Sequence, residues 1–271
     1  MVAVAASLVL FIILYLLKES FGFMAEVSLF RFFTDSRWAP TDGLYNITPL
    51  VFGTLAASFG CLLICVPFGL ALAFYLNFYA PSWVNQPIKR GLGLCLAVPS
   101  VVYGLWGLTV FVPLINQYRP PGASLLAGIF ILAMMVFPIL VITISDELEL
   151  LKKKYLISAN SLGLSRPTFI FKIILPQIRY PLVNITLLQL GRALGETMAV
   201  LMVCGNVIQY PSSIFDPIRT LTSNIALEMA YASSAHRSAL FSTGFILMLF
   251  LCLLFALTYL FQKMQNHAKN I

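Results

Sequence analysis

Long apolar runs are the feature of this 271-residue sequence that most restricts its fold. A transmembrane helix needs about 20 mostly apolar residues to cross a hydrocarbon core of about 30 Å. Such runs occur at about residues 2–17, 47–78, 92–115, 124–144, 182–208 and 239–262. We therefore expect an all-α, polytopic membrane protein with about six transmembrane helices.

The composition agrees with this expectation. Hydrophobic residues make up 60% of the chain and charged residues only 10%, with a mean hydropathy of +0.91. A soluble domain carries about a quarter charged residues. A soluble enzyme, a disordered chain and a nucleic-acid-binding domain are therefore excluded, despite a pI near 9.2. The five cysteines lie in apolar runs without a CxxC pair, so the sequence predicts neither a disulfide framework nor a zinc site.

The basic residues predict the orientation in the membrane. Six spans place ten Lys and Arg residues on one side and six on the other, with Arg192 inside the fifth span. The side with ten should be cytoplasmic and should hold both termini. The first external loop, 18–46, mixes charges with aromatic residues, which predicts a segment at the membrane interface. This loop is either a plain connector or a docking surface, and its aromatic residues are Phe30, Phe32, Phe33 and Trp38.

The longest predicted cytoplasmic loop, 146–181, has the pattern of helix, glycine turn and second helix. Gly163 is placed as a C-terminal cap, Ser165 as the N-cap of the second helix, and Pro176 as its end. One apolar face of that helix is expected to contact a protein partner or to pack back on the bundle. That face consists of Phe169, Ile170, Ile173 and Ile174.

Two opposite charges lie inside the fifth span. Arg192 and Glu196 are spaced i,i+4, so on one helix they share a face and can pair. Gly191 and Gly195 form a GxxxG pattern that favours close helix packing. The charges are either a structural ion pair or part of an anion pathway, in which Arg offers planar donors and Glu restrains it.

The cytoplasmic loop resembles a known signature. Its spacing is similar to that of the EAA loop of ABC-transporter permeases: Gly163 is followed after nine residues by Ile173, and after one more residue by Leu175-Pro176. Where that family usually has Glu-Ala-Ala, this chain has Ile157-Ser158-Ala159. The resemblance implies coupling helices that sit in a groove of a cytoplasmic ATPase.

A second resemblance is more specific. The stretch 191–200 followed by Gly205-Asn206, and the stretch 98–104 followed by Trp106-Gly107, resemble the PstC-type subunit of phosphate-import ABC permeases. The likeness covers roughly residues 30–261. It implies a single permease domain over 1–271, with a core at about 47–262 and the type I ABC-importer fold.

The function that this resemblance implies is import of inorganic phosphate across the bacterial inner membrane. The implied partners are a PstA-type permease, two PstB-type ATPases that bind ATP and Mg, and an external PstS-type phosphate-binding protein. No cofactor is expected on this chain. Arg192 and Glu196 are the implied transport residues. Ser100, Tyr103 and Thr197 are weaker candidates, since hydroxyls in such helices more often bond to backbone.

Three other interpretations compete with this one. A membrane enzyme lacks residues for its chemistry, because the chain has only His236 and His267 and no HExxH, GxSxG or GxxxxGK[ST] motif. His236 is expected to be a solvated loop residue. A purely structural membrane subunit would not need the charged pair. A permease for sulfate or molybdate stays open on chemistry alone, because Arg does not distinguish tetrahedral anions.

Overall fold

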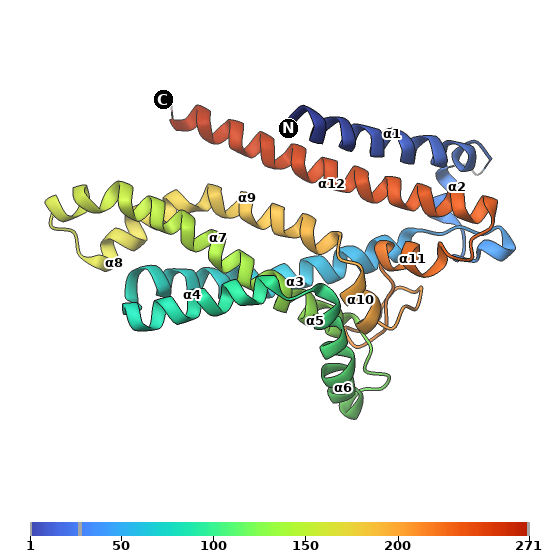
Figure 1. The fold of residues 1–271 in the computed structure, drawn as a ribbon, viewed down its shortest axis with the longest axis horizontal. Coiled ribbons are helices and arrows are strands. Elements are labelled where there is room, and N and C mark those ends of the chain that lie inside the picture. Colours follow the sequence, from blue (N-terminus) through green and yellow to red (C-terminus); the bar gives the residue numbers. More distant parts are fainter. Residues whose placement is uncertain (1, 27–28, 270–271) are drawn as a thin grey trace. The chain divides into compact units, whose positions relative to one another are not determined.

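The computed structural model describes residues 2–26 and 29–269, and every regular element in these ranges is helical (Figure 1). The α-helices are α1 (Val2–Glu26), α2 (Leu29–Thr34), α3 (Thr48–Phe74), α4 (Ser82–Ala97), α5 (Ser100–Trp106), α6 (Val112–Tyr118), α7 (Leu125–Ser161), α8 (Arg166–Phe169), α9 (Leu175–Leu194), α10 (Met198–Val203), α11 (Leu221–Glu228) and α12 (Ser234–Lys269). Short π-helical segments are η2 (Tyr75–Tyr79), η3 (Gly107–Phe111) and η4 (Ile170–Ile174), and η1 (Pro40–Asp42) is a 3₁₀ turn.

Among the described residues, four helical stretches are long and apolar enough to cross a membrane. They are Thr48–Tyr79, Ser100–Tyr118, Leu125–Ser161 and Ser234–Leu260. These stretches correspond to the second, third, fourth and sixth predicted spans. The first and fifth spans, and with them the count of six, stay predictions.

The third predicted span, 92–115, is divided at Pro99, which corrects the prediction of one continuous helix. α4 ends at Ala97, and Val98 is extended, with φ −73° and ψ 125°. A residue before proline is pushed out of the helical region by the proline ring. α5 begins directly afterwards, at Ser100.

The predicted cytoplasmic loop begins as a continuation of α7, whose 37 residues extend about 55 Å at about 1.5 Å each. The predicted turn is confirmed, because Gly163 has a φ of +64° and the Ser165 hydroxyl caps α8 by accepting from the Thr168 amide. The prediction that Pro176 ends the second helix is wrong. The chain continues through η4, and Pro176 is the second residue of α9, where a missing N–H is tolerated.

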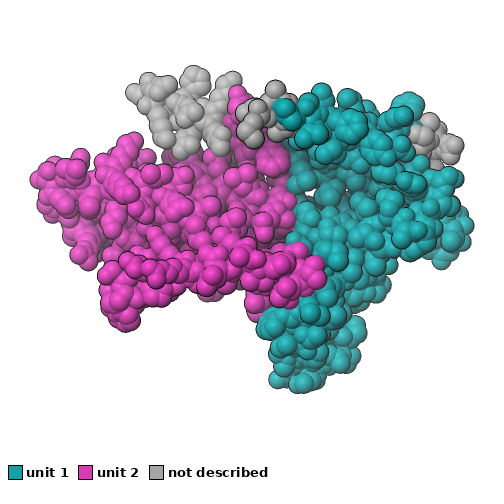
Figure 2. Space-filling model, in the orientation of Figure 1, with its two compact units in different colours: residues 1–57, 104–129, 194–253 teal, residues 58–103, 130–193, 254–271 magenta. Residues whose placement is uncertain are grey.

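The chain divides into two compact units (Figure 2). Unit 1 comprises residues 1–57, 104–129 and 194–253. Its core contains Phe32, Trp38, Tyr45, Ile47, Leu50, Leu221, Ala239 and Leu240. The expectation of an interfacial first loop is therefore wrong for Phe32 and Trp38, which are buried, whereas Phe30 and Phe33 are exposed. α1 packs beside α12, where the rings of Tyr15 and Phe241 meet edge to face at 5.9 Å (Figure 1).

Unit 2 comprises residues 58–103, 130–193 and 254–271. The apolar face of the loop helix is directed inward, because Phe169, Ile170 and Ile174 are buried and Ile173 is half-buried. The Phe169 ring meets Phe78 at a centroid distance of 6.2 Å. The expectation that this face is available to a partner is thus wrong for the three buried residues. Of the two alternatives, packing back on the bundle is the one observed.

Candidate functional site

The fifth predicted span is interrupted at the charged pair. α9 ends at Leu194 and α10 begins at Met198, so residues 195–197 are not helical. Arg192 and Glu196 therefore do not share one helix face, and Gly195 lies outside α9 rather than in a GxxxG helix surface with Gly191. Both predictions assumed an unbroken helix and are wrong on that point.

Glu196 is held in place by the segment that follows it. Its carboxylate accepts a hydrogen bond from the Ala199 amide at 3.3 Å, and this bond satisfies one free donor at the start of α10. Its backbone carbonyl accepts one from the Thr222 hydroxyl of α11 at 2.8 Å. Arg192 lies in the last turn of α9 and is exposed in the single chain. Arg192 belongs to unit 2 and Glu196 to unit 1.

The three weaker pathway candidates lie near the ends of helices. The Tyr103 hydroxyl donates to the Cys95 carbonyl at 2.9 Å, and the Thr197 hydroxyl donates to the Gly195 carbonyl at 3.3 Å. Ser100 is the first residue of α5. Tyr103 and Thr197 thus make the backbone bonds that are usual for such hydroxyls.

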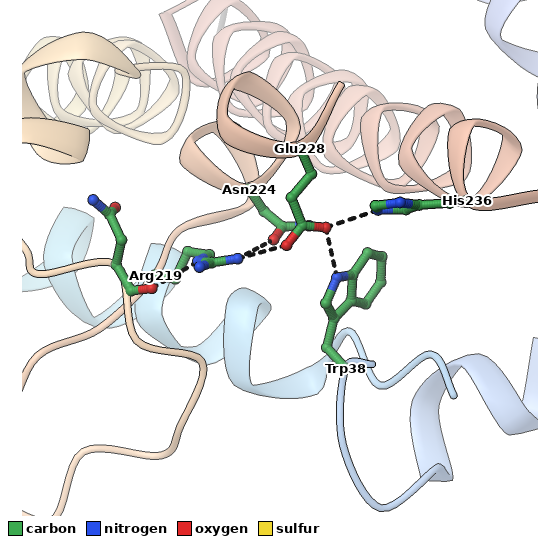
Figure 3. Close-up of polar contacts among 6 residues, drawn as sticks. Trp38, Arg219, Asn224, Glu228 and His236 are labelled. Carbon is green, nitrogen blue, oxygen red and sulfur yellow. Dashed lines mark hydrogen bonds and ion pairs between the residues drawn. The ribbon is translucent and has the colours of Figure 1, made fainter. Parts of the chain in front are cut away.

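A buried polar network in unit 1 was missed by the sequence reasoning (Figure 3). The Glu228 carboxylate, with its side chain 8% exposed, binds Arg219 at 2.7 Å and His236 Nε2 at 2.8 Å. It also accepts a hydrogen bond from Trp38 Nε1 at 2.9 Å. The network joins the segment after α2, the end of α11 and the start of α12. His236 is buried, so the expectation of a solvated histidine is wrong.

Arg219 extends the network to the loop that follows α10. Its Nε donates to the Asn206 carbonyl at 2.8 Å, and its guanidinium also donates to the Asn224 side chain at 3.0 Å. Asn206 has a φ of +56°, an unusual backbone conformation that these bonds support. The network therefore fixes loop 204–220 onto α11. The only sequence signal for it was a group of ionisable residues in an otherwise apolar chain.

A cavity of about 410 Å³ adjoins this network, and its lining includes Glu228, His236, Thr41 and Tyr231. Within the described residues, no group of three His, Cys, Asp or Glu side chains could hold a metal ion.

Comparison with known proteins places the chain in a family. The model of the binding-protein-dependent transport system inner membrane component family matches residues 65–267. The chain belongs to this family. The phosphate transport system permease protein PstC of Pasteurella multocida is 34% identical over 241 residues, which are 81% of this chain and 75% of that relative. PstC of Haemophilus influenzae is 31% identical, covering 87% and 82%. The probable ABC transporter permease YqgH of Bacillus subtilis is 34% identical, covering 92% and 82%.

The fold has a counterpart among solved structures. A chain of an inward-facing MetNI methionine ABC transporter superposes with a TM-score of 0.57 at 17% identity, covering 84% of this chain and 96% of that one. At this identity the likeness concerns the fold alone. The predicted type I ABC-importer permease fold is confirmed, and the chain is an integral membrane permease with several apolar helices.

Proposed function

We propose that this chain is the membrane-spanning subunit of an ATP-driven importer for inorganic phosphate. The observation that carries the proposal is its similarity, over most of its length, to the phosphate permeases described above. A PstA-type permease would complete the translocation pathway, and a PstS-type protein would deliver phosphate from outside. Two PstB-type ATPases would bind ATP and Mg²⁺ and hydrolyse the nucleotide. Both termini would be cytoplasmic.

Arg192 is the residue proposed to meet the anion in the pathway. Its guanidinium presents a planar fork of donors that matches the oxygen atoms of phosphate. Charged residues inside membrane-spanning segments are rare and costly, so the presence of Arg192 favours a functional role. The adjacent interruption supports this placement, because irregular backbone at membrane depth is tolerated where protein or a water-filled cavity surrounds it.

Glu196 has two proposed roles at the interruption. By capping α10 it holds residues 195–197 in a defined conformation. Its negative charge also limits how strongly the pathway retains an anion, and permeation requires binding that is weak enough for release.

The ATPase is proposed to contact the exposed part of the cytoplasmic loop. Ile157 and Leu162 are 77% and 74% exposed, and Gly163 makes the turn between α7 and α8. In this assignment Gly163 and Pro176 frame the loop, whereas Phe169 and Ile170 stabilise it from inside. Contact with the ATPase would thus not require the glutamate of the usual Glu-Ala-Ala pattern, whose position is occupied here by Ile157.

The decisive experiment is transport by the reconstituted complex with Arg192→Ala, Arg192→Lys and Glu196→Gln. We expect Arg192→Ala to lower phosphate import about tenfold or more, as loss of a charge-assisted hydrogen bond predicts. Arg192→Lys should recover part of the rate because it keeps the charge. Arg179→Ala is a matched control, because Arg179 is exposed on the same helix and bonds to its neighbour Tyr180.

Each result selects between the proposals. An Arg192→Ala complex that assembles normally and imports phosphate at the parental rate would exclude the pathway assignment and favour a structural subunit. Equal stimulation of ATP hydrolysis by sulfate or molybdate, each delivered with its own binding protein, would assign the chain to a broader oxyanion permease.

A further inference from the structure

Unit 2 contains a cavity of about 530 Å³ that the proposed transport pathway does not use. It lies between the end of the long apolar helix α3–η2, the polar extension of α7 and the first residues of the loop helix. Its polar lining includes Asn77, Lys152, Asn160 and Arg166. Two cations and no carboxylate line it, so its electrostatic preference is for an anion.

The Lys152 side chain is held in place by contacts within the chain. Its ammonium donates to the Asn77 carbonyl at 2.8 Å and lies 5.5 Å from the centre of the Phe78 ring. The Phe78 ring is in turn supported by Phe169. An ammonium has three donors, and one is used here, so two are available to a ligand.

Arg166 supplies a second, less restrained group. It is the first residue of α8 and is exposed. Within the described ranges its guanidinium makes no hydrogen bond or ion pair. A guanidinium offers five donors in a planar fork that matches phosphate oxygens in bidentate fashion. Lys152 and Arg166 thus approach the cavity from two different segments, α7 and the coupling loop.

An adjacent cavity of about 320 Å³ differs from the larger one because a carboxylate lines it. It shares Lys152 and Asn77 but is also lined by Glu149. The Glu149 carboxylate lies 2.8 Å from Lys153 and 3.9 Å from Lys89. Glu149 therefore competes with an incoming anion for the lysines of this smaller cavity, whereas no carboxylate lines the larger one.

The size and surroundings of the larger cavity indicate the kind of anion. Its volume lies within the usual range of about 300–1,000 Å³ for organic ligands, and its lining includes Phe78, Leu156 and Leu164 as well as the two cations. Three exposed aromatic side chains lie beside the cavity in sequence: Tyr75 and Tyr79 belong to η2, and Trp83 belongs to the start of α4. Exposed Tyr and Trp mark the headgroup level of a membrane.

We propose that this cavity binds the phosphate group of an anionic phospholipid headgroup, through Lys152 and Arg166. Basic pockets on the cytoplasmic side of membrane proteins recognise such headgroups. Inorganic phosphate has the same recognition chemistry and is the alternative source of the anion. A bound headgroup would link the end of α3 to the coupling loop, so anionic lipid would stabilise that loop. The proposal does not depend on which solute the chain transports.

The test uses the full chain in nanodiscs of phosphatidylcholine alone, of phosphatidylcholine with phosphatidylglycerol, and of phosphatidylcholine with added inorganic phosphate. Lipid retention is measured by native mass spectrometry, and the thermal midpoint is measured in each condition. Lys152→Gln/Arg166→Gln should bind phosphatidylglycerol about 25-fold more weakly, at about fivefold for each basic residue. The double variant should also lose the rise in thermal midpoint that phosphatidylglycerol is expected to give the parental protein. Lys154→Gln/Lys172→Gln is the matched control, because both lysines are exposed and neither lines the cavity.

Single variants guard against a general folding defect. Arg166→Gln removes a side chain without a described partner and should weaken lipid binding alone, whereas Arg166→Lys should restore most of it. If inorganic phosphate, and not phosphatidylglycerol, raises the midpoint in a manner that needs Lys152 and Arg166, the lipid assignment is wrong and the site is for free phosphate. Equal behaviour of the double variant and its control in all three conditions would overturn the site itself.

Discussion

At the scale of single residues, Glu228 carries a charge in a nearly closed environment. Removing one member of a buried, hydrogen-bonded charge pair leaves the other unpaired and costs about 3–5 kcal/mol. Glu228→Gln keeps the shape of the side chain but leaves Arg219 without its carboxylate. We therefore expect the free energy of unfolding of the solubilised protein to fall by about 3–5 kcal/mol, as measured by denaturant titration.

Asp42→Asn is the control for this change. Asp42 pairs with Arg37 at 2.7 Å, yet the two side chains are 49% and 67% exposed. Exposed pairs contribute about 0–1 kcal/mol, so the control should unfold almost as the parent does. Equal losses for the two variants would mean that the Glu228 network is open to solvent.

Asp216 gives a pH dependence in loop 204–220. Hydrogen bonds from the Ser212 hydroxyl, and then from the Ser213 and Ser212 amides, lower the pKa of its carboxyl below the ordinary value for aspartate. A lowered folded-state pKa favours the folded loop above the ordinary pKa, near 3.9, and this contribution is lost as the pH falls through the lowered value.

We expect hydrogen-exchange protection of the Ser212 and Ser213 amides to persist to a lower pH than an ordinary aspartate would allow. Asp216→Asn should remove this acid dependence and leave weaker protection at every pH. A parental protein whose protection declines around the ordinary aspartate pKa would contradict the assignment.

At the scale of elements, Gly104 permits a close approach between α5 and α10. A Cβ at this position would lie 2.9 Å from the Cα of Ala199 and would force the backbones apart. We expect Gly104→Ala to destabilise the protein by about 1–3 kcal/mol, the usual range for overpacking, and to reduce transport by displacing α10. Gly91→Ala is the control, since nothing lies within 4 Å of its Cβ position. Parental stability in both variants would contradict this packing.

Glycine is required at position 163 because of the backbone conformation there, and not because a side chain would clash with a neighbour. Its φ is +64°, and no atom would meet an added Cβ. A β-branched residue in this left-handed conformation costs about 1–2 kcal/mol, whereas asparagine tolerates it. Gly163→Val should therefore raise ATP hydrolysis per phosphate imported in the assembled complex, and Gly163→Asn should leave the ratio near the parental value. If the two variants hydrolysed the same amount of ATP per phosphate imported, this turn would have no role in coupling ATP hydrolysis to import.

The sequence predicts best those elements whose conformation is determined by their own local residue pattern. The apolar helices α3 and α7 and the Gly163–Ser165 turn follow from composition and capping residues. The interruption at Pro99 could not be predicted from proline alone, because Pro67 and Pro138 lie inside the unbroken helices α3 and α7. The break at 195–197 has no such signal and is accompanied by bonds from Ala199 and Thr222. Trp38 and Glu228 are separated by 190 positions, and periodicity does not reveal a contact over that distance.

At the scale of the whole molecule, the distribution of charge predicts the orientation of the chain in the membrane. Ten basic residues on one predicted side and six on the other predict that the loop between α7 and α9 is cytoplasmic. The same assignment puts η1 and the Glu228 network outside.

Topology can be measured with single cysteines in a chain whose native cysteines have been replaced, at Cys61, Cys65, Cys95, Cys204 and Cys252. A membrane-impermeant maleimide added to intact cells should label Asp42→Cys on the external loop but not Lys154→Cys on α7. Both should be labelled after permeabilisation. A cysteine added after Ile271 should behave like Lys154→Cys, because an even number of spans returns the chain to the cytoplasm. External labelling of that added cysteine, with the other two as expected, would mean that the number of spans after α7 is odd, and the six-span topology would be wrong.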